Sequence, residues 1–264
     1  MSQSASRWFI WVLLLAGIAA AYWYFVAHEN IPIPAEFTGP ATSDKYETPE
    51  PLHPLPPPGD SATDARTLVP LPPLDDSDKY FELALQDLFG DNVGDLLVDQ
   101  ALIEKVVATI DNLPRKAVAE RIRPVGRADG NFTVAAGANE DEYELDPENF
   151  GRYTALANQL ASADLDNVVE TYRRFYPLLQ EAYVNLGYPG KYFNDRVVEV
   201  IDHLLSTPVP TEPIRLRRPH VLYQFADPEL EALSSGQKLL LRIGNDNAAK
   251  VRSFLEGLRS RIAA

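Results

Sequence analysis

Residues 166–186 read DNVVETYRRFYPLLQEAYVNL. Their apolar side chains recur at offsets of three and four residues, which places them on one face of a helix. The residues of this face are Val168, Tyr172, Phe175, Leu179, Ala182 and Leu186. Pro177 lies inside the run and cannot donate a backbone hydrogen bond to Arg173, so we expect it to kink the helix or to split it in two. The stretch predicts a central helix, with Phe175 and Leu179 in the core of a helical domain.

Helical patterns continue upstream of this stretch. We expect a helix that is capped by Ser77 or Asp78 and ends at Gly90, because Ser and Asp favour the first position and Gly the position after the last. A second pattern covers residues 96–110, and a shorter helix is expected over residues 117–122. These elements begin the folded part of the chain, which we place at residues 77–264.

Further helices are expected downstream. Asn194 is placed to cap a helix that ends before Pro208, and Asp227 to cap one that begins at Pro228. The last helical patterns cover residues 238–243 and 248–262.

Two segments between the helices lack helical periodicity. Residues 126–137 are rich in Gly and contain the string FTV at residues 132–134, so the pattern admits one small β-hairpin there. Residues 208–219 predict an irregular connection. The sequence therefore predicts a mainly α fold, a compact multi-helix domain with room for one small β-hairpin.

The N-terminal region predicts a membrane anchor. Residues 8–27 read WFIWVLLLAGIAAAYWYFVA, and this uncharged run is about as long as a helix that crosses the ~30 Å hydrocarbon core of a membrane. Arg7 precedes the run, so the positive-inside rule predicts a cytoplasmic tail at residues 1–7 and everything after Ala27 outside. The alternative is a signal peptide cleaved near residues 19–21, although the apolar run continues past that point.

A proline-rich, acidic tether follows the predicted anchor. Residues 28–76 contain twelve of the 22 prolines and many more acidic than basic residues. Such a segment buries too little apolar surface to offset its chain entropy, so we expect it to be disordered and extended, with residues 28–74 packed on nothing. The tether predicts a spacer that lifts the domain off the membrane. A Pro-x-x-Pro ligand is the sharper alternative.

Composition excludes several classes of function. The chain has 24 Lys and Arg against 38 Asp and Glu, for a net charge of −14, and it contains no Cys. A surplus of acids disfavours nucleic acid as the main partner, because phosphate binding needs a basic surface. Without Cys there is no disulfide, no thiolate metal site and no Cys nucleophile.

Several uncommon strings occur in an order that resembles one known family. They are DNLPR (111–115), RY (152–153), YRRFYPLLQEAYVNLGYP (172–189), YFNDRVVEVIDHLL (192–205), RPHVLYQFADPELEAL (218–233) and GQKLLLRIG (236–244). From about Leu71 onward the chain resembles the proteobacterial family known as domain of unknown function 3014. The resemblance implies a Gram-negative envelope protein anchored in the inner membrane. It implies no activity, and no catalytic residue can be carried over.

One helix face offers a weak candidate metal site. Asp195, Glu199 and His203 follow one another at intervals of four residues, so they share a polar strip, and Glu and His one turn apart suit zinc or iron. No second HExxH or ExxH half accompanies them. The strip is better interpreted as a solvated helix face with a Glu–His pair, and we expect no cofactor.

Other charged residues were weighed for catalysis and for anion binding. Glu181 and Asp202 are nominal acid and base candidates for glycan cleavage, but no GxSxG elbow and no lysozyme-like string is present. If they converge, the cations of the C-terminal part could hold a phosphate or carboxylate. These cations are Arg215, Arg217, Arg218, Lys238 and Arg242.

Tyrosines are concentrated in the same region. They are Tyr153, Tyr172, Tyr176, Tyr183, Tyr188, Tyr192 and Tyr223. Most are expected in the core with their hydroxyl groups bonded locally, whereas Tyr176 and Tyr183 could also line a groove for a peptide or a glycan.

No motif identifies a reaction, and the leading hypothesis is non-enzymatic. We expect a binding or scaffolding domain presented in the periplasm, on a tether from the inner membrane, to an envelope protein or a cell-wall partner. The alternatives are a glycan- or peptide-cleaving enzyme of the cell wall that uses carboxylates, and a sensor of an anionic ligand.

Overall fold

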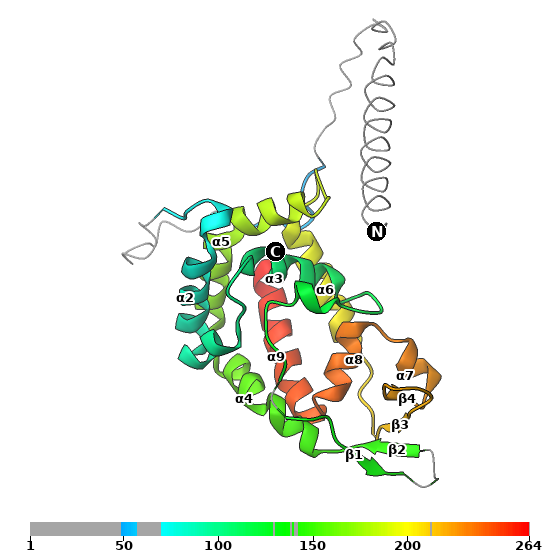
Figure 1. Ribbon diagram of the computed structural model, residues 1–264. Helices are drawn as coiled ribbons and strands as arrows, with labels where there is room; N and C mark the ends of the chain where they lie inside the picture. The colour runs from blue at the N-terminus through cyan, green and yellow to red at the C-terminus, as the bar shows by residue number, and fades with distance from the viewer. Residues whose placement is uncertain are drawn as a thin grey trace, which may run out of the picture. The chain divides into compact units, whose positions relative to one another are not determined.

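The central helix is present as α5, Leu165–Asn185, with Pro177 inside it. The helix is continuous, and Figure 1 shows that its axis changes direction along its length. Pro177 therefore bends the helix and does not split it, as expected for a residue that removes one backbone hydrogen bond. Phe175 is 1% exposed and Leu179 3% exposed, which confirms both as core residues. Leu186, expected on the same face, is 42% exposed because it lies at the end of the helix.

The computed structural model describes residues 49–56, 70–128, 130–137, 139, 142–211 and 213–263. The helices beside α5 are α2 (Asp78–Phe89), α3 (Leu102–Asn112), α4 (Glu148–Ser162), α6 (Phe193–Leu205), α7 (Pro228–Ala232), α8 (Ser235–Arg242) and α9 (Asn245–Ile262). The short 3-10 helices are η2 (Leu74–Asp76), η3 (Asp91–Leu96) and η4 (Glu120–Ile122). The strands are β1 (Val134–Ala136), β2 (Glu142–Leu145), β3 (Arg215–Arg217) and β4 (Gln224–Phe225).

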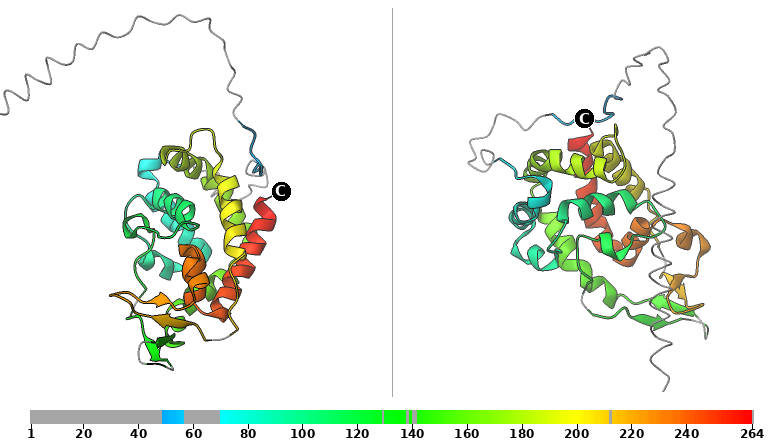
Figure 2. Two further views of the ribbon diagram at one scale, coloured as in Figure 1. Left: turned by 90° about the vertical axis from the view of Figure 1, so that its right-hand side faces the viewer. Right: turned by 45° about the horizontal axis from the view of Figure 1, so that its top comes forward.

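The helices pack around α9 and α5. Helix α9 contacts α4, α5, α6 and α8, while α5 also contacts α2 and α3 (Figures 1 and 2). The largest buried cluster joins α2, α3, α5 and α6, and Phe81, Ile103, Phe175 and Phe193 lie in it. A smaller cluster lies between α6, α8 and α9. The prediction of a mainly helical domain is confirmed.

A small antiparallel sheet lies at one end of the helices, in the order β1-β2-β3-β4. Its β1–β2 pair, in which Val134 faces Leu145, confirms the predicted hairpin, although the hairpin extends beyond Gly137. Strand β3 lies within the segment expected to be irregular, and β4 was not predicted. Both are too short to show an alternating pattern in the sequence. Leu216 and Phe225 bury one face of the sheet against Leu241 of α8.

Two helix starts differ from the prediction. Residues 96–110 are not one helix, because Leu97 pairs with Val125 in a β-bridge and α3 begins only at Leu102. Asp78 does not cap its own helix. Its carboxylate accepts hydrogen bonds from the backbone N–H groups of Ala101 (2.7 Å) and Leu102 (2.7 Å), and so caps α3. The cap from Asp227 to α7 is confirmed.

Parts of the predicted tether pack on the helical unit. Leu74 is 6% exposed and belongs to the main core, and Leu55 and Leu71 pack against that core. The expectation that residues 28–74 pack on nothing is therefore wrong for the parts around these leucines. Their apolar side chains are spaced between prolines, and each finds a place on the helical unit.

The predicted anchor at residues 8–27 and the tail at residues 1–7 lie outside the described residues. Among the residues that the structure describes, no helix is both long and apolar enough to cross a membrane.

Replacing Phe175 by Ala should strongly destabilise the fold. The ring lies 5.0 Å from that of Phe81, between centroids, and its loss leaves a cavity. Such a change typically costs about 3–5 kcal/mol, or roughly 10 °C in melting temperature for a domain of this size. Thermal unfolding followed by circular dichroism measures the shift. Phe132, which is 39% exposed, is the control, and a Phe175→Ala shift no larger than that of Phe132→Ala would contradict the central role of α5.

Candidate functional site

The first turn of α6 carries three consecutive polar side chains that bond to different parts of the chain. Asn194 bonds to residues 53 and 262, Asp195 to residues 52 and 53, and Arg196 to the end of α3. This turn is the candidate site, because here three segments far apart in the sequence meet through charged and amide groups.

Helix α5 fixes the start of α6. Gln180 accepts a hydrogen bond from the Phe193 N–H at 2.8 Å, and its amide donates to the Lys191 carbonyl at 2.7 Å. The Tyr176 hydroxyl donates to Gln180 at 3.0 Å. Burial raises the pKa of Tyr176, although a hydrogen bond from the Asn194 backbone opposes the rise. Tyr176, proposed as a ligand-binding residue, thus supports the start of α6.

Tyr192 occupies the cap position of α6, so the expectation that Asn194 caps this helix is wrong. Asn194 is instead buried, with 1% of its surface exposed. Its side-chain oxygen accepts from the Tyr172 hydroxyl at 3.1 Å. Its amide donates to the carbonyl groups of Ile262 (2.9 Å) and His53 (2.8 Å). Burial is the main reason that the pKa of Tyr172 is raised well above its ordinary value. The amide is therefore held in a fixed direction by α5 and by the end of α9.

The Asp195 side chain binds main-chain groups of the segment that was predicted to be a free tether. Its two carboxylate oxygens accept hydrogen bonds from the backbone N–H groups of Leu52 (3.0 Å) and His53 (2.8 Å). Along residues 51–56 exposure alternates: Pro51, His53 and Leu55 are half-buried, whereas the residues between them are exposed. The chain bends at Leu52 and His53, which turns their two adjacent N–H groups toward the same carboxylate.

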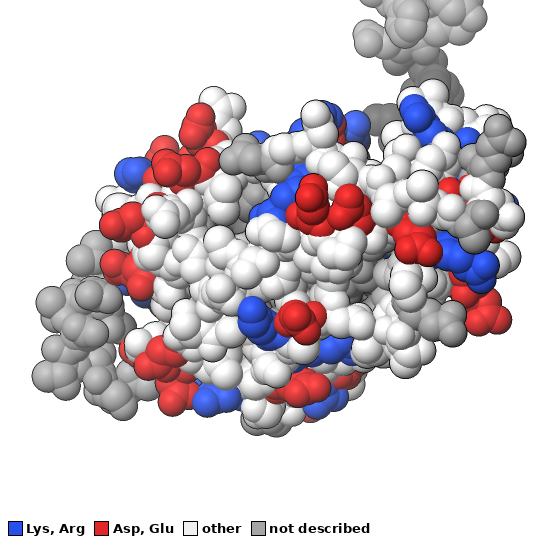
Figure 3. Space-filling model, turned by 90° about the horizontal axis from the view of Figure 1, so that it is seen from below, with Lys and Arg blue, Asp and Glu red and all other residues white. Residues whose placement is uncertain are grey.

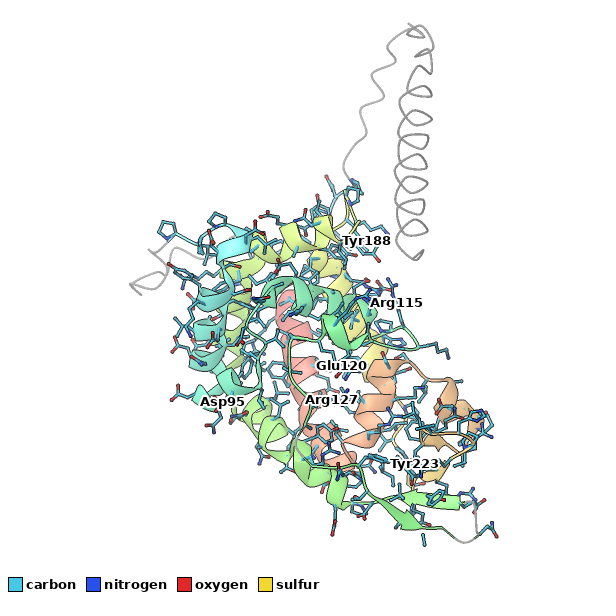
Figure 4. All side chains as sticks on the ribbon, in the orientation of Figure 1. Asp95, Arg115, Glu120, Arg127, Tyr188 and Tyr223 are labelled. Carbon is cyan, nitrogen blue, oxygen red and sulfur yellow. The ribbon has the colours of Figure 1, made fainter. Side chains whose placement is uncertain are left out.

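Arg196 forms a buried ion pair with Asp111. The Asp111 carboxylate is 3% exposed and accepts from Arg196 Nε (2.9 Å), from Arg115 Nη2 (2.9 Å) and from the Tyr188 hydroxyl (3.2 Å). Arg196 also donates to the Asp111 carbonyl at 2.7 Å and pairs with Glu199 at 2.8 Å. Figure 4 shows Arg115 and Tyr188 near each other on this side of the unit. All polar groups of the pair are bonded, so its role is to join α3, α6 and the loop after α5.

Tyr183 belongs to the core beside this ion pair. It is 3% exposed, stacks on Tyr188 with 4.7 Å between ring centroids, and contacts Phe193. Burial, followed by the negative charge of Asp111, raises the pKa of Tyr183 to about 12. The tyrosine face that was left open as core or groove is core at this position.

The weak metal candidates do not form one site. Asp195 bonds to residues 52 and 53, Glu199 pairs with Arg196, and His203 Nε2 lies 2.8 Å from the Ser234 hydroxyl. Among the described residues, no group of three or more His, Asp or Glu side chains is arranged to hold a metal ion.

Lys238 and Arg242 face an anion that the protein itself supplies. Lys238 Nζ lies 3.0 Å from a carboxylate oxygen of Glu231, whose other oxygen accepts from the Phe225 N–H at 2.9 Å. Burial alone would raise the pKa of Glu231, but the bonds from Phe225 and Lys238 and the charges of Lys238 and Arg242 lower it. The predicted anion site is thus occupied by Glu231.

Arg217 and Arg218 lie elsewhere, at the end of β3. Arg217 stands opposite Glu142 of β2 in the sheet register, which pairs opposite charges. Arg218 Nε donates to the Val221 carbonyl at 3.2 Å, and its guanidinium lies over the Tyr223 ring at 5.3 Å. The structure does not bring these arginines together with Lys238 and Arg242 in one cluster.

The acid–base candidates are not poised for catalysis. Glu181 is exposed on α5. Asp202 forms an ion pair with Arg259, and the hydrogen bond from Arg259 lowers the pKa of Asp202. A general acid for glycan cleavage needs a raised pKa instead. One apolar pocket, lined by Thr207, Val209, Leu240 and their neighbours, has a volume of about 60 Å³, room for a few water molecules.

Sequence reasoning missed the Asp111–Arg196 pair. The strings DNLPR and NDRVV were noted, but no periodic pattern assigns a polar residue on one helix to a polar residue 85 positions away. The signal that the sequence does contain is a charged residue, in each of the two strings, next to apolar residues of the core.

One family model matches the chain. It is described as Protein of unknown function (DUF3014) and matches residues 102–259, from the start of α3 almost to the end of α9. The match includes the Asp111–Arg196 pair and the first turn of α6, and begins after the docked residues 51–56. No curated protein and no solved structure matches.

Replacing Asp111 by Asn should lower the free energy of unfolding by about 3 kcal/mol, because it removes the buried counter-charge of Arg196 and leaves only the exposed Glu199 to balance it. Urea titration measures the change. The exposed Glu120–Arg127 pair, labelled in Figure 4, is the control, and Glu120→Gln should have no measurable effect. Equal effects of the two variants would mean that the buried pair does not stabilise the fold.

The raised pKa of Tyr183 predicts a loss of stability at alkaline pH. The neutral hydroxyl is favoured in the folded state, so its contribution is complete below pH ~10 and is lost as pH rises to about 12. Tyr183→Phe should therefore lose stability less steeply than the wild type over this interval, by about 1.4 kcal/mol per pH unit. Urea titrations at several pH values test this, with Tyr80→Phe, at a 46% exposed position, as control. Parallel wild-type and Tyr183→Phe curves would contradict it.

Proposed function

The chain belongs to the DUF3014 family, a family of proteins of unknown function, and we propose that its helical unit is a non-catalytic module that binds another envelope component. The observation that carries this proposal is an exposed apolar loop at the sheet end of the unit. Val221 is 77% exposed and its neighbour Leu222 is 76% exposed.

The loop is held in shape from within. Arg218 donates to the Val221 carbonyl and covers the Tyr223 ring, and that ring contacts Tyr143 of β2 at 5.2 Å and Phe132 at 5.7 Å between centroids. An apolar pair presented by a fixed loop loses little freedom on binding, which favours recognition of a partner. Adjacent, strongly exposed apolar side chains of this kind are typical of interaction sites.

Charge around this end of the unit does not favour a strongly charged partner. Figure 3 views the unit from below, where the sheet lies in Figure 1, and shows mostly uncharged surface with acidic and basic side chains interspersed. A mixed surface gives little long-range attraction for nucleic acid or for a polyanion. The partner of this proposal is therefore a protein or cell-wall component held mainly by apolar contact.

No observation favours the enzyme or the anion sensor among the described residues. Asp202 is held in an ion pair with Arg259, and Glu231 already occupies the position between Lys238 and Arg242. The binding module remains the better proposal.

The proposed setting is the periplasmic side of a bacterial inner membrane. In this proposal residues 8–27 span the membrane once, with residues 1–7 in the cytoplasm, and the acidic, proline-rich segment up to about residue 70 separates the unit from the bilayer. The uncharged apolar run and Arg7 before it support this orientation. A reporter that is active only in the periplasm, fused after Ala264, tests this orientation, and we expect it to be active. Activity of a cytoplasmic reporter at the same position would contradict the proposed orientation.

A photo-crosslinking residue at position 222 tests the binding proposal in living cells. We expect one discrete crosslinked product, which the change Val221→Ser in the same chain reduces several-fold without lowering the melting temperature. The control probe replaces Leu83 of α2, which is 51% exposed at a different surface. The same products from both positions, or none from position 222, would refute a partner at this loop.

A further inference from the structure

The docked tether residues show a mode of recognition that is separate from the apolar loop. Residues 51–56 lie at the start of α6, at the opposite end of the unit from β3 and β4 (Figures 1 and 2). Three hydrogen bonds hold them, and all three use main-chain atoms of the segment: the N–H groups of Leu52 and His53 and the carbonyl of His53.

Because proline has no backbone N–H, the prolines of the segment determine which of its residues can donate a main-chain hydrogen bond. The segment reads Pro51-Leu52-His53-Pro54-Leu55-Pro56, so Leu52 and His53 form its one pair of adjacent backbone donors. The two oxygens of Asp195 meet this pair. Prolines on both sides restrict the backbone and so reduce the entropy lost on binding, while the bend at Leu52 and His53 turns both N–H groups to one side. The site therefore fits the pattern Pro-x-x-Pro.

Side chains contribute selectively. Leu52 is 80% exposed, so the site does not read its side chain. Leu55 packs against the main core, where Tyr172 and Tyr176 also lie, and is the apolar contact one residue beyond the second proline. The receptor side exists apart from the segment, because Tyr172 and Ile262 already fix the amide of Asn194.

We propose that Asn194, Asp195 and the apolar surface beside them form a binding site for Pro-x-x-Pro-apolar peptides of a partner protein, which the chain's own residues 51–55 occupy in its absence. Because the three hydrogen bonds use main-chain atoms, a foreign segment of this pattern makes the same hydrogen bonds, and a positive side chain at the position of His53 adds attraction to Asp202. Binding of the partner segment releases residues 51–55, so the site couples partner binding to the length of free tether before the unit.

Competition between the two segments is the test. The probe is a fluorescent synthetic peptide with the sequence of residues 49–56, and the receptor is the full-length chain in detergent. The variant Leu52→Pro/His53→Pro removes both donors from the chain's own segment and leaves the site intact. We expect the peptide to bind this variant at least about tenfold more tightly than it binds the wild type, since its competitor is lost.

Asp195→Ala in the released variant should abolish peptide binding, whereas Glu181→Ala, which removes an exposed carboxylate of α5, should leave it within about twofold. A peptide with Ala in place of Leu55 should bind several-fold more weakly. Equal binding to wild type and released variant, or binding that survives Asp195→Ala, would overturn the proposal.

Hydrogen exchange gives a second readout that does not need the peptide. The Leu52 and His53 amides of the wild-type chain should be protected and should lose protection in Asp195→Ala, while amides of α3 keep theirs. Protection that appears only as the chain dimerises would assign the site to the segment of a second copy and overturn docking within one chain.

Discussion

The buried carboxylate of Asp111 joins three parts of the chain at a polar point beside the apolar core that they share. It ends α3, receives Arg196 from the first turn of α6, and bonds to Tyr188 in the loop between α5 and α6. A buried ion pair is favourable only when its remaining donors and acceptors are also bonded, and here Arg115, Glu199 and the Asp111 carbonyl complete the set. The orientation of α6 against α3 therefore depends on this geometry, while the apolar contacts around it tolerate more variation.

Because α6 is fixed in this way, the first turn holds a buried amide and a partly exposed carboxylate in fixed positions. Arg196 points into the ion pair, so its neighbours Asn194 and Asp195 are held toward the end of α9 and toward residues 51–56. Gln180 and Tyr176 of α5 satisfy the start of the helix, which leaves the Asp195 carboxylate available to accept from another segment. The same turn thus stabilises the fold on one side and holds the docked segment on the other.

Helical periodicity predicted the elements with long apolar faces and failed where a local polar contact decides the structure. Phe175 and Leu179 were placed in the core because three- and four-residue spacing is a property of the sequence alone. The cap of α3 was missed because Asp78 lies 23 residues before the N–H group that it accepts from. Strand β3 pairs with the distant β2, β4 pairs with β3, and both pack on α8, so their two or three residues carry no signal of their own. For the same reason Lys238 and Arg242 were considered as part of an anion site, whereas Lys238 pairs with Glu231 of the preceding helix.

Composition misjudged the tether for a related reason. Many prolines and acids do predict a segment that cannot form a core of its own. They say nothing about a surface elsewhere in the chain that accepts its backbone, and prolines improve such docking by removing conformations that the free segment would otherwise lose. At residues 51–55 the donors that bind belong to the main chain, so neither Leu52 nor His53 marks the contact by its side chain. What the sequence does contain is the receptor: a carboxylate beside an amide in the first turn of α6, where the buried amide of Asn194 and the carboxylate of Asp195 both meet the docked segment.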